Sequence, residues 1–229
     1  LNFFIMRIFI RTFVAILTAS SLIACGGSEE KASTPVSFCK DTACVTEPIE
    51  VKGTGAGNPM VRITFNDCKI DTIHWEKGGM GVIKDMVFNE FITNDMRPTK
   101  EAFNCTIIGS KYAWIKFNDC TTGRGFLLRL PFDKDGTTSK YTSAINNFDP
   151  AFKVADGLVA FYDNTFIYVE DMETGLVAKQ LLTDTGVRDI DFNDVHSLIE
   201  TVDITKEKIY AKLKVDGKTI EHNNPLTFK

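Results

Sequence analysis

Hydrophobic and polar residues follow one another in short runs along the chain from about residue 38 to its end. Segments 60–65, 112–117 and 158–162 are typical, because they are rich in β-branched and aromatic residues and are bounded by Asn, Asp and Gly. Runs of this length and composition predict β-strands. The chain is therefore predicted to be all-β after its N-terminal region.

Two dipeptides stand where hairpin turns are expected. Asp163-Asn164 and Asp216-Gly217 each separate two apolar runs, and both consist of residues that tight β-turns favour. Helical periodicity is scarce by comparison, and its best candidates are the short segments 84–92 and 194–201. Helices are therefore expected to contribute little to the fold.

The pattern of runs also repeats along the chain. Residues 63–68 (ITFNDC) and 115–120 (IKFNDC) match at five of six positions, 52 residues apart. Residues 167–175 align with the second copy at the same offset, and residues 209–212 echo the third copy at the shorter offset of 42. The sequence thus contains about four related units.

Each unit is expected to contain three strands, of which the second and third are joined by an Asp-containing turn; the third strands are expected at 72–75, 126–129 and 177–181. Repeats of 40–50 residues made of β-hairpins are typical of propellers, arrays and solenoids. Residues 156–177, with the turn Asp171-Met172-Glu173-Thr174-Gly175, resemble a blade of the pyrroloquinoline-quinone-type propeller family. The resemblance implies a propeller-like array of about four units, although the family's blade-packing Trp is missing here. A β-sandwich or an open antiparallel sheet of the same hairpins is the alternative.

The first 24 residues have the features of a secretory signal sequence. They contain no acidic residue, Arg7 and Arg11 form a basic region, and residues 12–24 form a short apolar run that ends in small residues. A run of this length is too short for a typical spanning helix and predicts a signal helix that is removed. Met6 is placed as a natural start of translation.

The end of this segment, Leu22-Ile23-Ala24-Cys25, resembles the lipobox of bacterial lipoproteins. The resemblance implies cleavage before Cys25, a diacylglyceryl group on its thiol and an added acyl chain such as palmitate. Gly26 after the cysteine implies sorting to the outer membrane if the source is Gram-negative. An ordinary cleaved signal peptide with a chance cysteine is the alternative. We therefore predict a signal peptide at 1–24, an anchor and flexible tether at 25–37, and a folded domain at 38–229.

Composition and charge sharpen this picture. Removal of residues 1–24 lowers the number of Lys and Arg residues from 26 to 24 and leaves 30 Asp and Glu, so the formal net charge changes from −4 to −6. A nucleic-acid-binding protein would show a basic patch or stripe, so nucleic acid is not expected as a partner. The 18 Phe residues are an unusual number beside five Tyr and two Trp, and most are expected in the core.

Five cysteines remain beyond the anchor, and an exported protein meets an oxidising compartment in which disulfides are expected. The odd number leaves at least one thiol unpaired or bonded to another chain. A structural metal is not expected, because there is no CxxC motif and the three histidines are scattered. The candidate disulfide cysteines are Cys39, Cys44, Cys68, Cys105 and Cys120, and the histidines are His74, His196 and His222.

Four motifs contain residues that a metal, catalytic or phosphate-binding site would use, but each fits a turn, a strand or a loop better. Residues 133–136 (DKDG) resemble half of a calcium loop without the remaining ligands, and residues 189–194 alternate acids with apolar residues as edge strands and helix caps do. His74-Trp75-Glu76 fits a half-buried strand with His74 and Glu76 on one face. The glycine-rich segment 53–57 lacks the Lys-Ser/Thr of a phosphate loop and predicts a flexible loop.

No convergent catalytic set, metal site or cofactor site emerges from these motifs. The sequence therefore predicts a lipid-anchored envelope protein that is attached to the membrane through Cys25. It favours a non-catalytic binding or scaffolding domain for an envelope partner over an enzyme. The alternative is an envelope carbohydrate-active enzyme or other hydrolase that uses Asp and Glu side chains.

Overall fold

The computed structural model describes residue 43 and residues 45–78, 82–92 and 96–229. The chain divides into two units, residues 1–36 and residues 37–229, and all described residues belong to the second unit. The predicted signal peptide (1–24), the lipidation site Cys25 and the whole tether up to residue 37 lie outside the described residues, as do Cys39 and Cys44.

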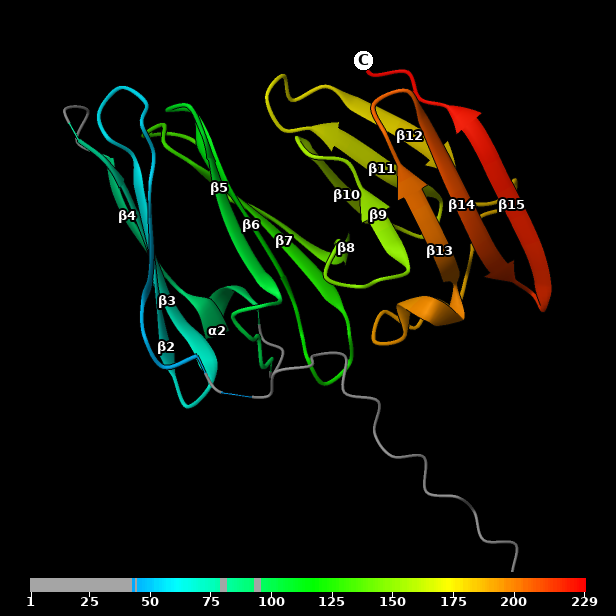
Figure 1. Cartoon of the computed structure of the whole chain (residues 1–229), viewed down its shortest axis with the longest axis horizontal. Helices are drawn as coiled ribbons and strands as arrows, with labels where there is room; N and C mark the ends of the chain where they lie inside the picture. The colour runs from blue at the N-terminus through cyan, green and yellow to red at the C-terminus, as the bar shows by residue number, and fades with distance from the viewer. Residues whose placement is uncertain (1–42, 44, 79–81, 93–95) are drawn as a thin grey trace, which may run out of the picture. The chain divides into compact units, whose positions relative to one another are not determined.

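The described residues form three β-sheets (Figure 1). Sheet A has the order β1-β2-β3-β4, sheet B the order β12-β11-β10-β8-β7-β6-β5, and sheet C the order β15-β14-β13-β9. Neighbouring strands are antiparallel except β9 and β13, which are parallel. The strands are β1 (Ile49–Lys52), β2 (Met60–Asn66), β3 (Lys69–Lys77), β4 (Val82–Val87), β5 (Phe103–Ile108), β6 (Tyr112–Asn118), β7 (Gly125–Pro131), β8 (Ser139–Ile145), β9 (Phe152–Val154), β10 (Leu158–Tyr162), β11 (Phe166–Asp171), β12 (Val177–Leu181), β13 (Ile199–Ile204), β14 (Lys208–Val215) and β15 (Lys218–Pro225). The prediction of an all-β chain is thus confirmed.

The two predicted hairpin turns are confirmed. Asp163-Asn164 lies between β10 and β11, where the Asp163 Oδ1 accepts the backbone N–H groups of Thr165 and Phe166. Asp216 and Gly217 join β14 to β15 with φ angles of 51° and 72°. Positive φ at both central residues is the geometry that matches the twist of a hairpin.

Neither predicted helix extends over its segment. Residues 84–92 form most of β4 and the four-residue helix α2 (Phe88–Phe91), and residues 194–201 form the 3-10 turn η1 (Val195–Ser197) and the start of β13. The helical spacing is misleading because Lys84 and Met86 already point inward from a strand, with the period of two that a pleated strand requires.

The sequence repeat has a structural counterpart in the turns of the second and third units. Asp119 and Asp171 each accept the N–H and the hydroxyl of a threonine three residues later. In both turns a glycine with φ of 75° donates its N–H to the aspartate carbonyl. A left-handed residue at this position favours glycine, so the Asp-x-x-Thr-Gly pattern encodes one turn used twice.

The prediction of a propeller-like array is not met, because the second and third units share one sheet. Strand β8 pairs with β10, which joins the two units edge to edge, and no closed propeller is formed by the described residues. Gly125 pairs with Ala144, so the next residues, Phe126 and Ile145, lie together on the opposite face of sheet B. That face packs against sheet A at Phe126 and against sheet C at Ile145, whereas a propeller blade packs its two neighbours on opposite faces.

Residues 226–229 join sheet C to sheet B. Leu226 donates its N–H to the carbonyl of Glu207, and the backbones of Lys229 and Val177 exchange two hydrogen bonds of 3.1 and 3.2 Å. The end of this sequence therefore lies along the edge strand β12 of the third unit.

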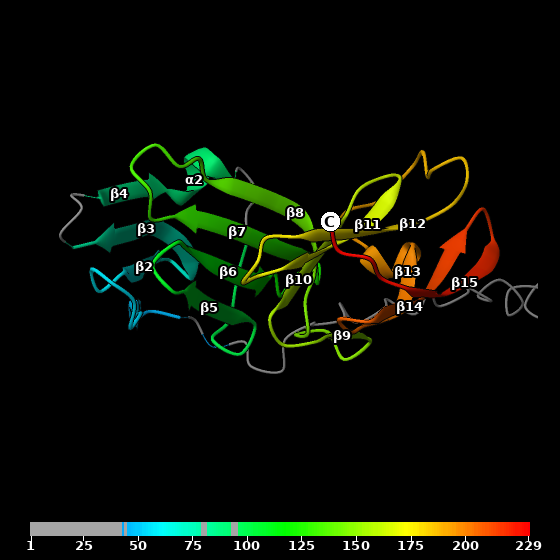
Figure 2. The same cartoon turned by 90° about the horizontal axis from the view of Figure 1, so that it is seen from above.

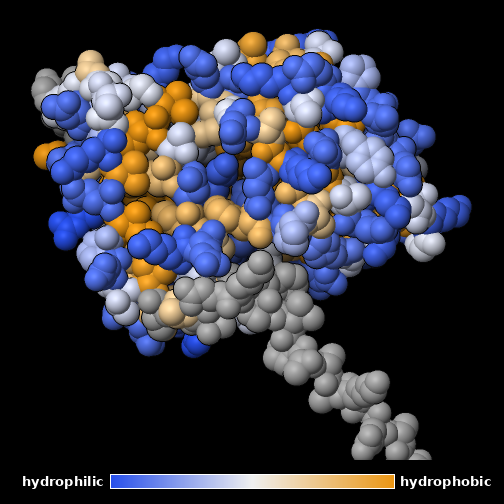
Figure 3. Space-filling view, viewed as in Figure 1, coloured by the Kyte–Doolittle hydropathy of each residue, from blue (hydrophilic) through white to orange (hydrophobic). Residues whose placement is uncertain are grey.

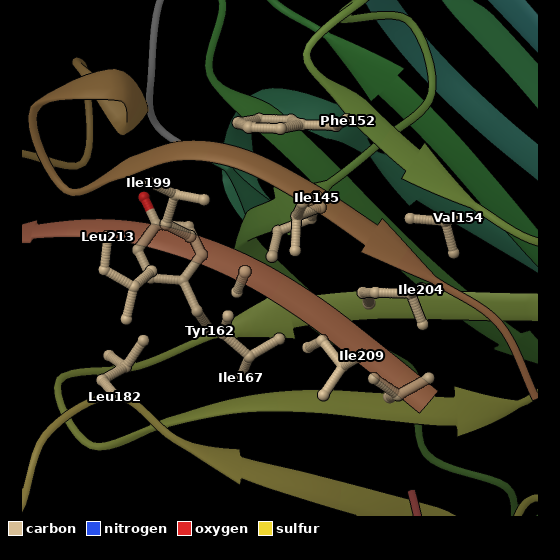
Figure 4. Close-up of a cluster of buried hydrophobic side chains, with 14 of the residues drawn as sticks. Ile145, Phe152, Val154, Tyr162, Ile167, Leu182, Ile199, Ile204, Ile209 and Leu213 are labelled. Carbon is tan, nitrogen blue, oxygen red and sulfur yellow. The ribbon is translucent and has the colours of Figure 1, made fainter. Parts of the chain in front are cut away.

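Sheets A and C lie beside different parts of sheet B (Figures 1 and 2), and a buried core fills each of the two spaces between them. The N-terminal core lies between sheet A and strands β6 and β7, and its largest side chains are aromatic. The C-terminal core lies between β8, β10 and β11 and sheet C, and it is mainly aliphatic (Figure 4). The aromatic residues of the N-terminal core are Trp75, Phe88, Phe117, Phe126 and Phe132.

Candidate functional site

Strand β3 places a histidine between two carboxylates on the outer face of sheet A. Trp75 points inward, is 3% exposed, and donates its indole N–H to the carbonyl of Pro131 at 3.0 Å. The neighbouring His74 and Glu76 point outward, because successive side chains alternate between the faces of a strand. The predicted division of this triplet between two faces is thus confirmed.

The His74 ring contacts Asp85 of β4 and Glu76 of its own strand. Its Nδ1 lies 2.7 Å from Asp85 Oδ1, and its Nε2 lies 3.4 Å from Glu76 Oε2. Burial of the ring opposes its charged form, but the hydrogen bonds and charges of the two carboxylates outweigh burial and raise the pKa of His74. Both ring nitrogens face carboxylates in the described part of the chain, so this histidine is not set up to activate a nucleophile.

Strand β4 forms one edge of sheet A and exposes two large apolar side chains. Ile83 is 67% exposed, Val87 is 47% exposed, and the side chain of Asp85 between them is 63% exposed. All three share the outer face, because they pair with Glu76, Thr72 and His74 of β3 respectively. In Figure 3, apolar side chains reach the surface on the side where Figure 1 places sheet A. An exposed apolar group of this kind on a sheet edge marks a candidate interaction site.

The other face of β4 is tied to the protein. The Lys84 ammonium donates to the carbonyl oxygens of Asp133 and Gly136 at 2.8 and 2.9 Å. These carbonyls belong to the segment that resembles half of a calcium loop, so a lysine of the same chain takes the place that a cation would need. The contact also links β4 to the loop between β7 and β8.

The glycine-rich segment 53–57 packs on the turn after β5, where a Cβ added to Gly55 would lie 2.5 Å from the carbonyl oxygen of Gly109. Its glycines therefore allow close contact between backbones.

Three other edge strands of the described residues are covered, polar or short. Strand β12 is paired at Val177 with Lys229, β15 is almost entirely polar, and β9 has three residues. Strand β4 stands apart from these edges.

The face of sheet B opposite the two cores carries four rings in a row, which we name the aromatic ladder: Trp114, Tyr141, Phe161 and Tyr168. Successive rings are stacked, with centroids 6.3, 4.0 and 5.0 Å apart. The ammonium of Lys179 lies 5.1 Å from the last ring. Because the ring faces contact one another and a lysine, they stabilise the sheet and offer no open platform for a planar or sugar ligand.

A buried carboxyl lies beside this ladder. Glu170 is 4% exposed, and its Oε1 lies 3.3 Å from the Arg129 guanidinium, which also stacks over Tyr112 at 4.3 Å. Burial raises the pKa of Glu170, and the charge of Arg129 opposes that rise. Among the described carboxyls, Glu170 is the one whose pKa is shifted upward, which is the direction that a general acid requires.

The acidic segment 189–194 is used for turns and packing. Asp191 Oδ1 accepts the backbone N–H of Asn193, and Phe192 stacks on Tyr162 with the Arg124 guanidinium 5.5 Å above its ring. Among the residues that the structure describes, no group of three or more His, Cys, Asp or Glu side chains is placed to bind a metal ion.

The candidate disulfide cysteines differ in their state. Cys68 and Cys120 are disulfide-bonded, whereas Cys105, which was included as a candidate, is a free thiol. Its side chain packs against the N-terminal core from β5, and burial raises its pKa to about 12. A thiol with so high a pKa is largely unreactive at neutral pH.

The sequence did not reveal Ile83, Asp85 and Val87 as site residues, because Asp85 and Val87 fall in the segment 84–92, which was predicted to be helical, and Ile83 directly precedes it. No apolar–polar alternation within 82–87 (VIKDMV) marks them, because the inward positions include Lys84 and the outward positions include Ile83 and Val87.

Comparisons with known proteins give no relative for this chain. No family model matches it, and no curated protein or solved structure matches it either. Within the described residues, the structure contains no helix with the length and apolar character needed to cross a membrane.

Proposed function

We propose that this chain is a non-catalytic, protein-binding domain of the bacterial cell envelope that binds its partner through the outer edge of β4. The observation that carries the proposal is the exposure of Ile83 and Val87 on one face of an edge strand. Apolar side chains exposed beside unpaired backbone groups mark sites where another chain adds to a sheet. Because the comparisons give no match, the proposed binding role rests on this site alone.

The N-terminal sequence supports the proposed location in the cell envelope. The segment Leu22-Ile23-Ala24-Cys25 resembles a lipobox, and lipid on Cys25 would hold the domain at a membrane. Gly26 favours the outer membrane of a Gram-negative cell. Residues 26–37 are small and polar, and such a composition suits a flexible tether between the lipid and the folded domain.

The chemistry-bearing side chains support a role without catalysis. His74 lies between two carboxylates, Glu170 is paired with Arg129, and Asp171 bonds its own turn and the ammonium of Lys206. Each group therefore has a structural partner. An envelope hydrolase is the second candidate, and the raised pKa of Glu170 is the observation that favours it.

The first experiment tests the anchor. Mass spectrometry of the mature protein is expected to find lipid on an amino-terminal Cys25, and the Cys25→Ala variant is expected in the soluble fraction. A wild-type product that begins elsewhere and is recovered without membranes would refute the anchor.

The second experiment tests the binding edge. Crosslinking and affinity capture from intact envelopes are expected to recover a partner with the wild type and to lose it with Ile83→Thr/Val87→Thr. A matched control is Thr219→Ala on the exposed strand β15, which should capture as the wild type does. Equal capture by all three proteins would contradict the proposed site, and loss of a hydrolytic activity in Glu170→Gln would favour the second candidate.

A further inference from the structure

We propose that the partner adds an extended segment to sheet A as a strand beside β4, and that this segment carries a basic residue between two apolar residues. The inference deepens the proposed function and rests on it, because it names the chemistry of the partner at the same edge.

The backbone of β4 has a free side. Strand β4 is the last strand of sheet A, and among the described residues its backbone pairs with β3 alone. Its six residues are about as long as an average strand. The N–H and C=O groups on the outer side can therefore pair with a new strand, as in other cases of strand addition.

The side chains of β4 specify the pattern of the added strand. Ile83, Asp85 and Val87 alternate along the outer face, all largely exposed. Side chains directly opposite one another on neighbouring strands interact, and apolar pairs and opposite charges are favourable. The complementary segment thus reads apolar, any residue, basic, any residue, apolar, in either strand direction.

Asp85 can accept this basic residue. Its Oδ1 contacts His74 at 2.7 Å, while Oδ2 has no partner among the described residues. The carboxylate therefore keeps one oxygen for a lysine or arginine that comes from the open side of β4. A charge-assisted contact of this kind adds specificity to the apolar contacts on either side.

The same charge disfavours a second copy of this chain as the partner. An antiparallel pair of β4 strands that places Ile83 opposite Val87 also places Asp85 opposite Asp85 of the other copy, and like charges in that position are destabilising. Moving the register by two residues places Asp85 opposite Ile83 or Val87. No such register satisfies all three side chains, so a different protein fits the edge better.

Two short capped peptides test the inference with the purified full chain. One has lysine at its centre with valine two residues to either side and threonine elsewhere, and the other has glutamate in place of the lysine. Fluorescence anisotropy of the labelled peptides gives their affinities, and amide chemical shifts locate the bound peptide. We expect the lysine peptide to bind the wild type roughly 3- to 10-fold more tightly than the glutamate peptide.

The Asp85→Lys variant is expected to reverse this preference, and its exposed site makes retention of the fold easy to verify by thermal melting. Thr219→Lys on β15 is the matched control and should keep the preference of the wild type. Equal affinity of the two peptides for the wild type, or an unchanged preference in Asp85→Lys, would overturn the inference. If envelope capture still depends on Ile83 and Val87 in that case, the proposed function survives without this partner chemistry. Dimerisation of the wild type that Ile83→Thr abolishes would assign the edge to a second copy and would also overturn it.

Discussion

The N-terminal and C-terminal cores support similar strands with different side chains. The N-terminal core is built around aromatic rings, with Phe117 stacked on Phe126 at 5.3 Å and on Phe103 at 6.1 Å. The C-terminal core is filled mainly by isoleucine, valine and leucine (Figure 4). Both cores pack on the same face of sheet B. The repeat therefore preserves strands and turns, whereas the side chains that fill the space between the sheets differ from one core to the other.

The two regions also differ at their edges. Around the C-terminal core, β12 is paired with residue 229 and β15 displays polar side chains. Around the N-terminal core, β4 exposes Ile83 and Val87. Natural sheets normally protect their edges against pairing with another chain. This contrast between the two regions is the reason for which we propose a binding role for β4.

The largest effect is expected from the aromatic core. Phe117→Ala removes a fully buried ring with three aromatic neighbours and should lower the free energy of unfolding by about 3–5 kcal/mol. Ile209→Val, in the C-terminal core, should cost about 0.5–1.5 kcal/mol. Denaturant titration of both variants checks this. A Phe117→Ala cost near that of Ile209→Val would contradict the description of the N-terminal core as the ring-dependent one.

The second-largest effect on stability is expected from the charge of Asp171, which distinguishes its turn from the equivalent turn at Asp119. Asp171 accepts hydrogen bonds from its turn and from the Lys206 ammonium, which together lower its pKa to about 2. A depressed pKa contributes stability above the unfolded value of 3.8, and this contribution is lost as the pH falls toward 2. Asp171→Asn should therefore cost about 1–2 kcal/mol at neutral pH and almost nothing near pH 2.

Thermal melting of Asp171→Asn across this pH range provides the measurement. Asp119→Asn is the matched variant, since Asp119 forms the same turn but has no described ammonium partner. A cost for Asp171→Asn that stays constant with pH would contradict the role of its charge.

A smaller effect is expected at an ion pair beside the C-terminal core. His196 Nε2 lies 2.7 Å from Asp149 Oδ2, and the hydrogen bond and charge of Asp149 raise the pKa of His196. A raised pKa contributes stability that is complete below the unfolded value of 6.5 and is lost as the pH rises through the folded value. The stability difference between the wild type and His196→Gln should thus be greatest at about pH 5–6, at roughly 0.5–1 kcal/mol. A difference that grows above neutral pH would refute this assignment.

The smallest effect on stability is expected at the binding edge. Ile83→Thr/Val87→Thr changes exposed side chains outside both cores and should alter the free energy of unfolding by no more than about 0.5 kcal/mol. Thermal melting measures this directly. A larger loss would mean that the two side chains stabilise sheet A itself. Capture experiments with this variant would then not distinguish loss of the binding site from unfolding.

Local sequence determined what could be predicted of the fold. The strands, the turns at Asp163 and Asp216, and the repeated turn at Asp171 follow from alternation and from residues that favour tight turns. The joining of the second and third units could not be predicted, because the pairing of Ala144 with Phe161 depends on which edges meet in space. A sequence repeat predicts the strands and turns within each unit, but it does not predict how the units pair with one another.

The candidate site could be predicted only in part. The outward direction of His74 and Glu76 follows from strand alternation, but the approach of Asp85 to His74 depends on the pairing of β3 with β4. Exposure of Ile83 was hidden for the same reason, since alternation alone does not say which face of a strand is covered. Lys84 likewise reaches carbonyls about 50 residues away, which no local pattern encodes.

Site-specific photo-crosslinking in intact envelopes is the most direct test of the proposed binding of a partner protein at the outer edge of β4. A photo-reactive amino acid replaces Ile83 in one protein and Thr219 of β15 in the other, both at exposed positions on edge strands. We expect a discrete crosslinked product from position 83 and none from position 219. Products of equal yield from both positions, or none from position 83, would contradict it.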